Sequence, residues 1–150
     1  MDAPAATLAA AIEELIPGWV VRSVSRVATE AGWDLDGDLR AAAEEAGERA
    51  RVEVGAATRA LLETDVDEQR TNPLSLLRDA VRYPTEVLRA AGVPARAKRD
   101  DFTMRAFPDD VYDLAPATWS DVDPGLQEPG IAWGAWKAYT HLSRRRDQDR

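Results

Sequence analysis

The feature that most constrains the fold is a set of apolar residues recurring every three or four positions, without any sustained apolar–polar alternation. The longest stripe lies in residues 38–66 and comprises Leu39, Ala43, Ala46, Ala50, Val54, Ala57 and Leu61. This repeat places the side chains on one face of an α-helix, whereas a half-buried strand needs a repeat of two. The sequence therefore predicts an all-α fold, with one helix of roughly 28 residues over this segment.

Other residues predict where helices start and stop. Asp36 or Asp38 can cap the long helix. Its two internal glycines, Gly47 and Gly55, are each expected to weaken it by about 1 kcal/mol relative to alanine. Pro17-Gly18 is expected to interrupt the N-terminal apolar stretch, leaving a first short helix over residues 5–15.

Prolines and a glycine mark further helices in the middle of the chain. Asn72-Pro73 is typical of a helix start, with the asparagine as cap and the proline in the first turn. A second proline, Pro84, predicts that another helix begins there and runs over 84–91, and Gly92 is expected to end it. The last helix is expected over about 130–145, with a core-facing stripe of Ile131, Ala135, Ala138 and Leu142.

Residues 1–150 are expected to form one helical domain. The size of 16.5 kDa suits a single core, and no Gly/Ser-rich linker divides the chain. Prolines and aspartates concentrate near 107–129, which predicts an irregular loop there. The expected architecture is a single-domain bundle of five to seven helices.

Composition excludes several kinds of chemistry. The chain has no cysteine, which removes thiol catalysis and cysteine-based metal sites. His141 is the single histidine, so most zinc sites and Ser–His–Asp catalysis lack partners. We expect no bound cofactor.

Charge and hydropathy bear on partners and location. The net charge is −8, and the arginines of Arg144-Arg145-Arg146 are followed by aspartates, so nucleic-acid binding is not expected. The start Met1–Pro4 lacks the basic residues of a secretion signal. No apolar run approaches the roughly 18 residues that span a bilayer. We therefore expect a cytoplasmic protein without membrane contact.

Three segments in the second half of the chain carry a resemblance to other proteins. They are Val81-Arg82-Tyr83-Pro84-Thr85-Glu86-Val87-Leu88, Phe107-Pro108-Asp109-Asp110-Val111-Tyr112-Asp113-Leu114 and Glu128-Pro129-Gly130. They resemble uncharacterised small proteins of actinobacteria that have no assigned activity. The resemblance covers about residues 60–146. It implies a bacterial cytoplasmic protein and carries no catalytic residues with it.

Asp109, Asp110 and Asp113 are the candidate metal ligands. Three carboxylates within five residues can hold a hard divalent cation that keeps several waters. This reading makes the protein a small metal-assisted enzyme. The other reading is that Asp109 or Asp110 caps a short helix while Val111 and Leu114 anchor the segment to the core.

Trp133, Trp136 and Tyr139 are the candidate partner-binding residues. If the stripe that includes Ile131 docks on the core, these aromatic side chains are surplus, and at least one should be exposed. Tryptophan and tyrosine often anchor interfaces. The other reading is that Trp133 or Trp136, or both, belong to the core. The leading hypothesis is a non-enzymatic interaction or regulatory protein that binds a protein partner, or itself as a homodimer, through its aromatic C-terminal half. A pocket of convergent carboxylates favours the enzyme, whereas an exposed apolar patch favours the binding protein.

Overall fold

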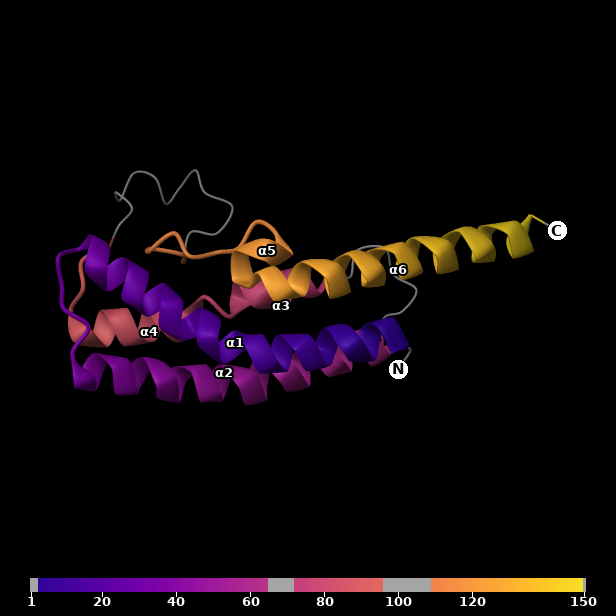
Figure 1. Ribbon diagram of the computed structural model, residues 1–150. Helices are drawn as coiled ribbons and strands as arrows, with labels where there is room; N and C mark the ends of the chain where they lie inside the picture. Colours follow the sequence, from indigo (N-terminus) through magenta and orange to yellow (C-terminus); the bar gives the residue numbers. More distant parts are fainter. Residues whose placement is uncertain (1–2, 65–71, 96–108, 150) are drawn as a thin grey trace.

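The protein is all-α, as the periodicity predicted. The computed structural model describes residues 3–64, 72–95 and 109–149, and these residues contain no β-strand. Figure 1 shows the arrangement of the helices. Their bounds are α1 (Ala3–Glu30), α2 (Gly37–Thr64), α3 (Pro73–Asp79), α4 (Arg82–Ala91), α5 (Trp119–Val122), the 3₁₀ turn η2 (Pro124–Leu126) and α6 (Gln127–Gln148).

Helix α1 corrects the expected interruption at Pro17. It runs unbroken for 28 residues with the proline inside it, and it changes direction near its middle (Figure 1). An internal proline removes one backbone hydrogen bond and typically bends a helix rather than ending it when packing holds both sides. Here the residues on both sides of Pro17 are buried, including Ile12, Ile16 and Val20.

The continuous α1 also bears on the membrane expectation. By length and composition alone, Ala3–Glu30 is apolar enough to cross a bilayer, which the sequence reading did not foresee. The helix packs against α2, α4 and α6. Leu8, Ile12 and Val24 are fully buried within that packing. In the structure, buried residues along the length of α1 belong to the hydrophobic core.

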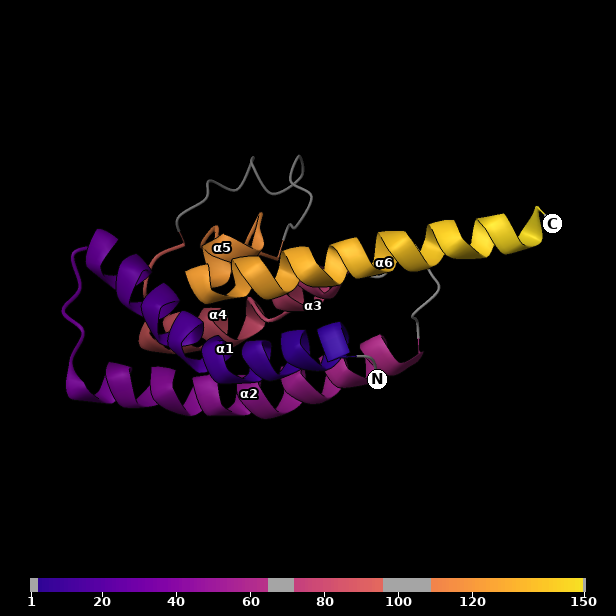
Figure 2. The ribbon, with the colours of Figure 1, turned by 45° about the vertical axis from the view of Figure 1, so that its right-hand side comes forward.

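Helices α1 and α2 lie side by side in opposite directions (Figures 1 and 2). The two glycines of α2 sit at their contact. A Cβ on Gly47 would lie 3.0 Å from the carbonyl oxygen of Pro17, and one on Gly55 would lie 2.6 Å from Cγ of Glu13. The expectation that these glycines only weaken the helix is therefore incomplete, because they let α1 approach closely.

The long helix α2 is confirmed at 28 residues. Asp36 is its cap, since its carboxylate accepts the backbone N–H of Leu39 at 2.8 Å. The predicted buried stripe holds from Leu39 to Val54 and then shifts by one position. Ala57 is exposed and Leu61 half-buried, while Thr58 and Leu62 are buried instead. From Val54 the buried residues are spaced by four, at Thr58 and Leu62, whereas the predicted stripe took a spacing of three to Ala57. The spacing of four keeps these side chains on the side of the helix that faces the core.

Helix α3 begins and helix α4 ends at the predicted positions. The Asn72 side chain accepts the backbone N–H of Leu74 at 3.0 Å, with Pro73 in the first turn. Helix α4 starts at Arg82, two residues before the expected position. Pro84 is tolerated there because the first-turn N–H groups of a helix have no partner within the helix. Gly92 ends α4 with φ of 83°.

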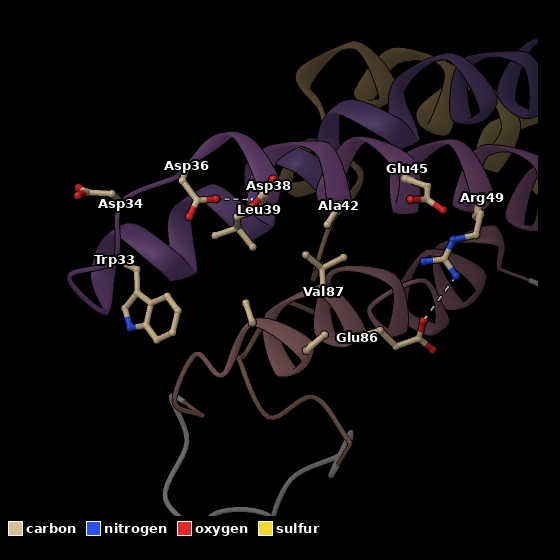
Figure 3. Close-up of a pocket in the computed structure, with 12 residues that line it drawn as sticks. Trp33, Asp34, Asp36, Asp38, Leu39, Ala42, Glu45, Arg49, Glu86 and Val87 are labelled. Carbon is tan, nitrogen blue, oxygen red and sulfur yellow. Dashed lines mark hydrogen bonds and ion pairs between the residues drawn. The ribbon is translucent and has the colours of Figure 1, made fainter.

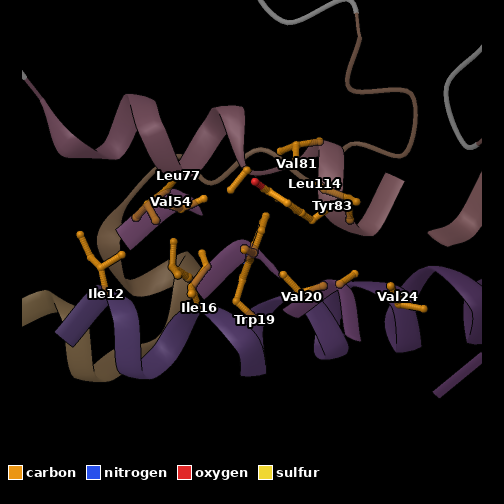
Figure 4. Close-up of a cluster of buried hydrophobic side chains, with 14 of the residues drawn as sticks. Ile12, Ile16, Trp19, Val20, Val24, Val54, Leu77, Val81, Tyr83 and Leu114 are labelled. Atoms are coloured by element: carbon orange, nitrogen blue, oxygen red, sulfur yellow. The ribbon is translucent and has the colours of Figure 1, made fainter. Parts of the chain in front are cut away.

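The core lies between α1 and the helices around it (Figure 4). Ile16 and its neighbours in α1 face apolar side chains from three other parts of the chain. These are Leu77 of α3, Val81 and Tyr83 at the start of α4, and Leu114 in the segment before α5. One cluster of buried side chains joins all these elements.

The segment expected to be an irregular loop near 107–129 is partly helical. Residues 107–108 lie outside the described residues, α5 and η2 occupy the second half, and α6 begins at Gln127 rather than near 130. Arg22 of α1 secures this region, since its guanidinium donates to the Val122 carbonyl at 2.6 Å and pairs with Asp123 at 3.3 Å.

Helix α6 crosses over the bundle and then leaves it. Its first half lies along α1 near α5, whereas its second half extends beyond the other helices (Figures 1 and 2). The helix has 22 residues, about 33 Å at the usual rise. The candidate site lies on this projecting helix.

Candidate functional site: the outer face of α6

The stripe predicted to dock α6 on the core points to solvent. Ile131 is 61% exposed and Leu142 is 55% exposed. The two alanines between them, Ala135 and Ala138, are exposed as well. Tyr139 borders this stripe and is 72% exposed. We call these five residues the outer face of α6, and the expected orientation of the helix was wrong.

The opposite side of α6 makes the contact with the bundle. Trp133, about half a turn around the helix from Ile131, is only 6% exposed. At Gly130 an added Cβ would lie 2.6 Å from the Trp119 ring, so the helix and α5 approach closely. The tryptophans therefore anchor α6, and Trp136 also packs partly against the core.

This orientation divides the predicted partner-binding residues. Trp133 belongs to the core, as the second reading of the tryptophans expected, and is not part of the exposed surface. Trp136 is half-buried, and Lys137 lies over the Trp133 ring at 4.9 Å from its centroid. Tyr139 alone is strongly exposed, as expected of at least one of the three aromatic residues.

Charges sit at the two ends of the outer face. Glu128 is exposed at the start of α6, and Arg145 and Arg146 are exposed at its end. At 100° per residue, Glu128 and Arg146 lie on the side of the face that carries Tyr139. These signs also complement the helix dipole. The outer face is thus an apolar stripe with an acid at one end and bases at the other.

Among the described residues, the candidate ligands Asp109, Asp110 and Asp113 do not form a metal site. The buried Asp110 carboxylate accepts the backbone N–H groups of Leu114 at 2.7 Å and Ala115 at 2.8 Å. Asp109 and Asp113 are exposed. Within the described residues, no group of three His, Asp or Glu side chains could hold a metal ion. Asp110 is a structural acceptor, close to the capping role that the sequence also suggested, although it caps a turn rather than a helix.

The other aspartates of this region act in the same way. Asp121 accepts the backbone N–H groups of Ala117 and Thr118 at 3.0 and 2.9 Å. Asp123 accepts that of Gly125 at 2.9 Å. The density of aspartate here reflects backbone groups that lack helical partners.

A groove of about 670 Å³ lies between the α1–α2 connection, the start of α2 and α4 (Figure 3). Trp33, Leu39 and Val87 form its apolar part. Its rim carries the exposed carboxylates Asp34, Asp36, Asp38, Glu45 and Glu86. They are spread along the rim and do not converge, and Asp34 points away from the hollow (Figure 3). Glu86 also pairs with Arg49 at 4.0 Å. This groove carries no catalytic arrangement.

A polar cluster of Glu53, Arg82 and Tyr83 joins α2 to α4. The Tyr83 hydroxyl donates to the Glu53 carboxylate, and the Arg82 guanidinium donates to that hydroxyl at 2.7 Å. Burial and the hydrogen bond to Glu53 raise the pKa of Tyr83. The phenol therefore keeps its proton and serves as a structural donor rather than a nucleophile.

Sequence reasoning found the residues of the outer face but assigned them to the core. The missed signal is Gly130, which admits the Trp119 ring and so marks the inward side of α6. No protein-family model, curated protein or solved structure matches this chain.

Proposed function

We propose that the protein is a non-enzymatic interaction or regulatory protein, and that the outer face of α6 is its binding surface. The observation that carries this proposal is the exposure of Ile131, Tyr139 and Leu142 on one face of a helix that extends beyond its own bundle. Apolar stripes of this kind are the usual face of helices that dock on a partner.

The shape of α6 supports this assignment. A soluble helix generally turns its apolar stripe inward, where burial stabilises by about 25 cal/mol per Å². Here that stripe is left in water while two tryptophans anchor the other side. A partner that covers the outer face gains the burial that the bundle does not provide.

The enzyme hypothesis has less support among the described residues. Its three aspartates do not converge, and both oxygens of Asp110 are occupied by backbone N–H groups. The alternative of a divalent-metal-assisted enzyme therefore rests on no specific contact.

We also propose a bacterial, actinobacterial and cytoplasmic setting for this activity, without nucleic-acid or membrane partners. The resemblance over about residues 60–146 supports the source. A net charge of −8 and the lack of cysteine are compatible with an acidic protein of a reducing compartment.

The test uses matched apolar-to-acid variants at two exposed positions. Leu142→Glu changes the outer face, whereas Val52→Glu makes the same change on α2, where Val52 is 59% exposed. Proteins captured from native extract by the immobilised chain, together with self-association measured by sedimentation, should depend on Leu142 and not on Val52. Equal behaviour of the wild type and both variants in both measurements would refute the proposal.

A further inference from the structure

We infer that the outer face of α6 binds the same face of a second copy of this chain, with the two helices antiparallel. This inference rests on the proposed function and adds the identity of the partner. It follows from the internal symmetry of the outer face, in which side-chain size and charge are both self-complementary about one point.

The order of large and small side chains along the stripe is symmetric about a point between Trp136 and Lys137. In an antiparallel pair with a two-fold axis at that point, Ile131 lies opposite the partner's Leu142 and Ala135 lies opposite the partner's Ala138. The large side chains meet at the ends of the stripe and the small ones at its middle. Alanines at the middle allow the helix axes to approach closely, since interaxial distance depends on the side chains at the contact.

The charges follow the same two-fold axis. Exposed Glu128 at the start of α6 lies beside the partner's Arg146, within about one residue rise along the axis. Both residues lie on the side of the face that Tyr139 occupies. The pair therefore has an acid–base contact at each end, with opposite charges facing. A parallel pair would place Glu128 at the same height as the partner's Glu128 and arginine level with arginine, so that opposite charges would not face each other.

The bundle leaves room for this pairing. Each α6 contacts its own bundle through Trp133, on the side opposite to the outer face, and through Gly130, about 100° around the helix from Ile131. The two bundles consequently lie on opposite sides of the helix pair. The projecting half of each α6 then covers the bundle-attached half of the other, so that the whole stripe from Ile131 to Leu142 is buried.

Cysteine cross-linking tests the orientation, because the chain has no cysteine of its own. Glu128→Cys and Arg146→Cys are prepared as separate variants and mixed under mild oxidation or with a short bis-maleimide. The mixture should give a covalent dimer that contains one chain of each. Neither variant alone should, because in the antiparallel pair the two copies of either position are more than about 25 Å apart along the axis. Efficient self-linking of Glu128→Cys would show a parallel pair and overturn the inference.

Sedimentation over a range of concentrations tests the surface. Ala138→Asp, at the centre of the stripe, should weaken dimerisation by at least about tenfold in Kd. Glu128→Arg and Arg146→Glu should each weaken it less, and the double variant should recover the wild-type Kd because the charges are exchanged across the axis. A wild-type monomer at all concentrations, or a dimer indifferent to Ala138→Asp, would overturn the inference. If such a monomer still captures another protein through Leu142, the proposed function stands and only the identity of the partner is wrong.

Discussion

Helices α2 and α6 carry similar apolar stripes and use them in opposite ways. In α2, Ala43, Ala46 and Ala50 are completely buried against α1. In α6, Ala135 and Ala138 lie between two large apolar residues and are exposed. A stripe identifies the apolar side of a helix, but it does not identify the element that covers that side. In α6 it is the opposite side of the helix, with Trp133 and Trp136, that packs against the core.

Replacing an alanine by aspartate in each stripe should give the largest difference in stability between α2 and α6. Ala46→Asp buries a carboxylate without a partner and should reduce the free energy of unfolding by about 4 kcal/mol or more. Ala138→Asp should cost below about 1 kcal/mol, which is the lower helix propensity of aspartate. Urea unfolding at low protein concentration checks both variants. Similar losses at the two positions would contradict the contrast between α2 and α6.

The two sides of α6 should differ in a comparable way. Trp133→Ala removes a buried ring and should cost about 3–5 kcal/mol, whereas Tyr139→Ala on the outer face should change stability by less than about 0.5 kcal/mol. Thermal unfolding checks this. Trp133→Phe is the control, because it keeps most of the ring and removes an indole N–H that has no acceptor among the described residues. It should cost clearly less than the alanine variant.

The Asp109–Asp113 loop should respond as a structural element. Asp110→Asn replaces one of the two acceptor oxygens by an amide and should cost about 1–3 kcal/mol. The exposed Asp109→Asn should stay within about 0.5 kcal/mol. Magnesium or calcium should leave Tm unchanged in the wild type. A rise in Tm that both variants abolish would restore the metal hypothesis.

The smallest effect concerns the ion pair between α1 and α2. Arg59 donates to both oxygens of Glu13, at 2.5 and 2.9 Å, and this hydrogen bonding lowers the pKa of Glu13 below its ordinary value of 4.5. The pair therefore stabilises the fold above pH 4.5, and the contribution is lost as pH falls through the folded-state pKa. Because both side chains are partly exposed, the effect should be below about 1 kcal/mol.

Glu13→Gln should reduce the loss of stability between neutral and acid pH in urea unfolding. Glu48→Gln is the matched control, since Glu48 pairs with Arg51 within one exposed helix surface. An equal change in both variants would assign the pH dependence to general charge rather than to the contact between α1 and α2.

Local sequence signals predicted α2, α3, α4 and α6 and several of their ends. Asn72, Pro73 and Gly92 mark boundaries because their effects act on the adjacent backbone and need no distant contact. The helix end expected at Pro17 was wrong, because the packing of α1 on both sides of this proline outweighs the missing hydrogen bond. The same local logic explains the long α2, whose stripe is continuous.

The candidate site was predictable in composition but not in orientation. The stripe of Ile131 and Leu142 is evident from spacing, and so are the aromatic residues beside it. Choosing which side faces inward requires knowing that Trp119 approaches Gly130 from another part of the chain. Likewise, the aspartates of the loop show their role only once Asp110 is seen to accept two backbone N–H groups.

The contact of Gly47 with Pro17 also determines the lengthwise alignment of α1 and α2. Because the inward face of α2 is largely alanine, it offers similar surfaces to α1 after sliding by one turn, about 5.4 Å. Such a slide would bring Ala43 or Arg51 to the place where a Cβ would lie 3.0 Å from the Pro17 carbonyl oxygen. Of these three positions, only Gly47 lacks a Cβ. A single missing methyl group thus selects one arrangement of the hairpin among otherwise similar ones.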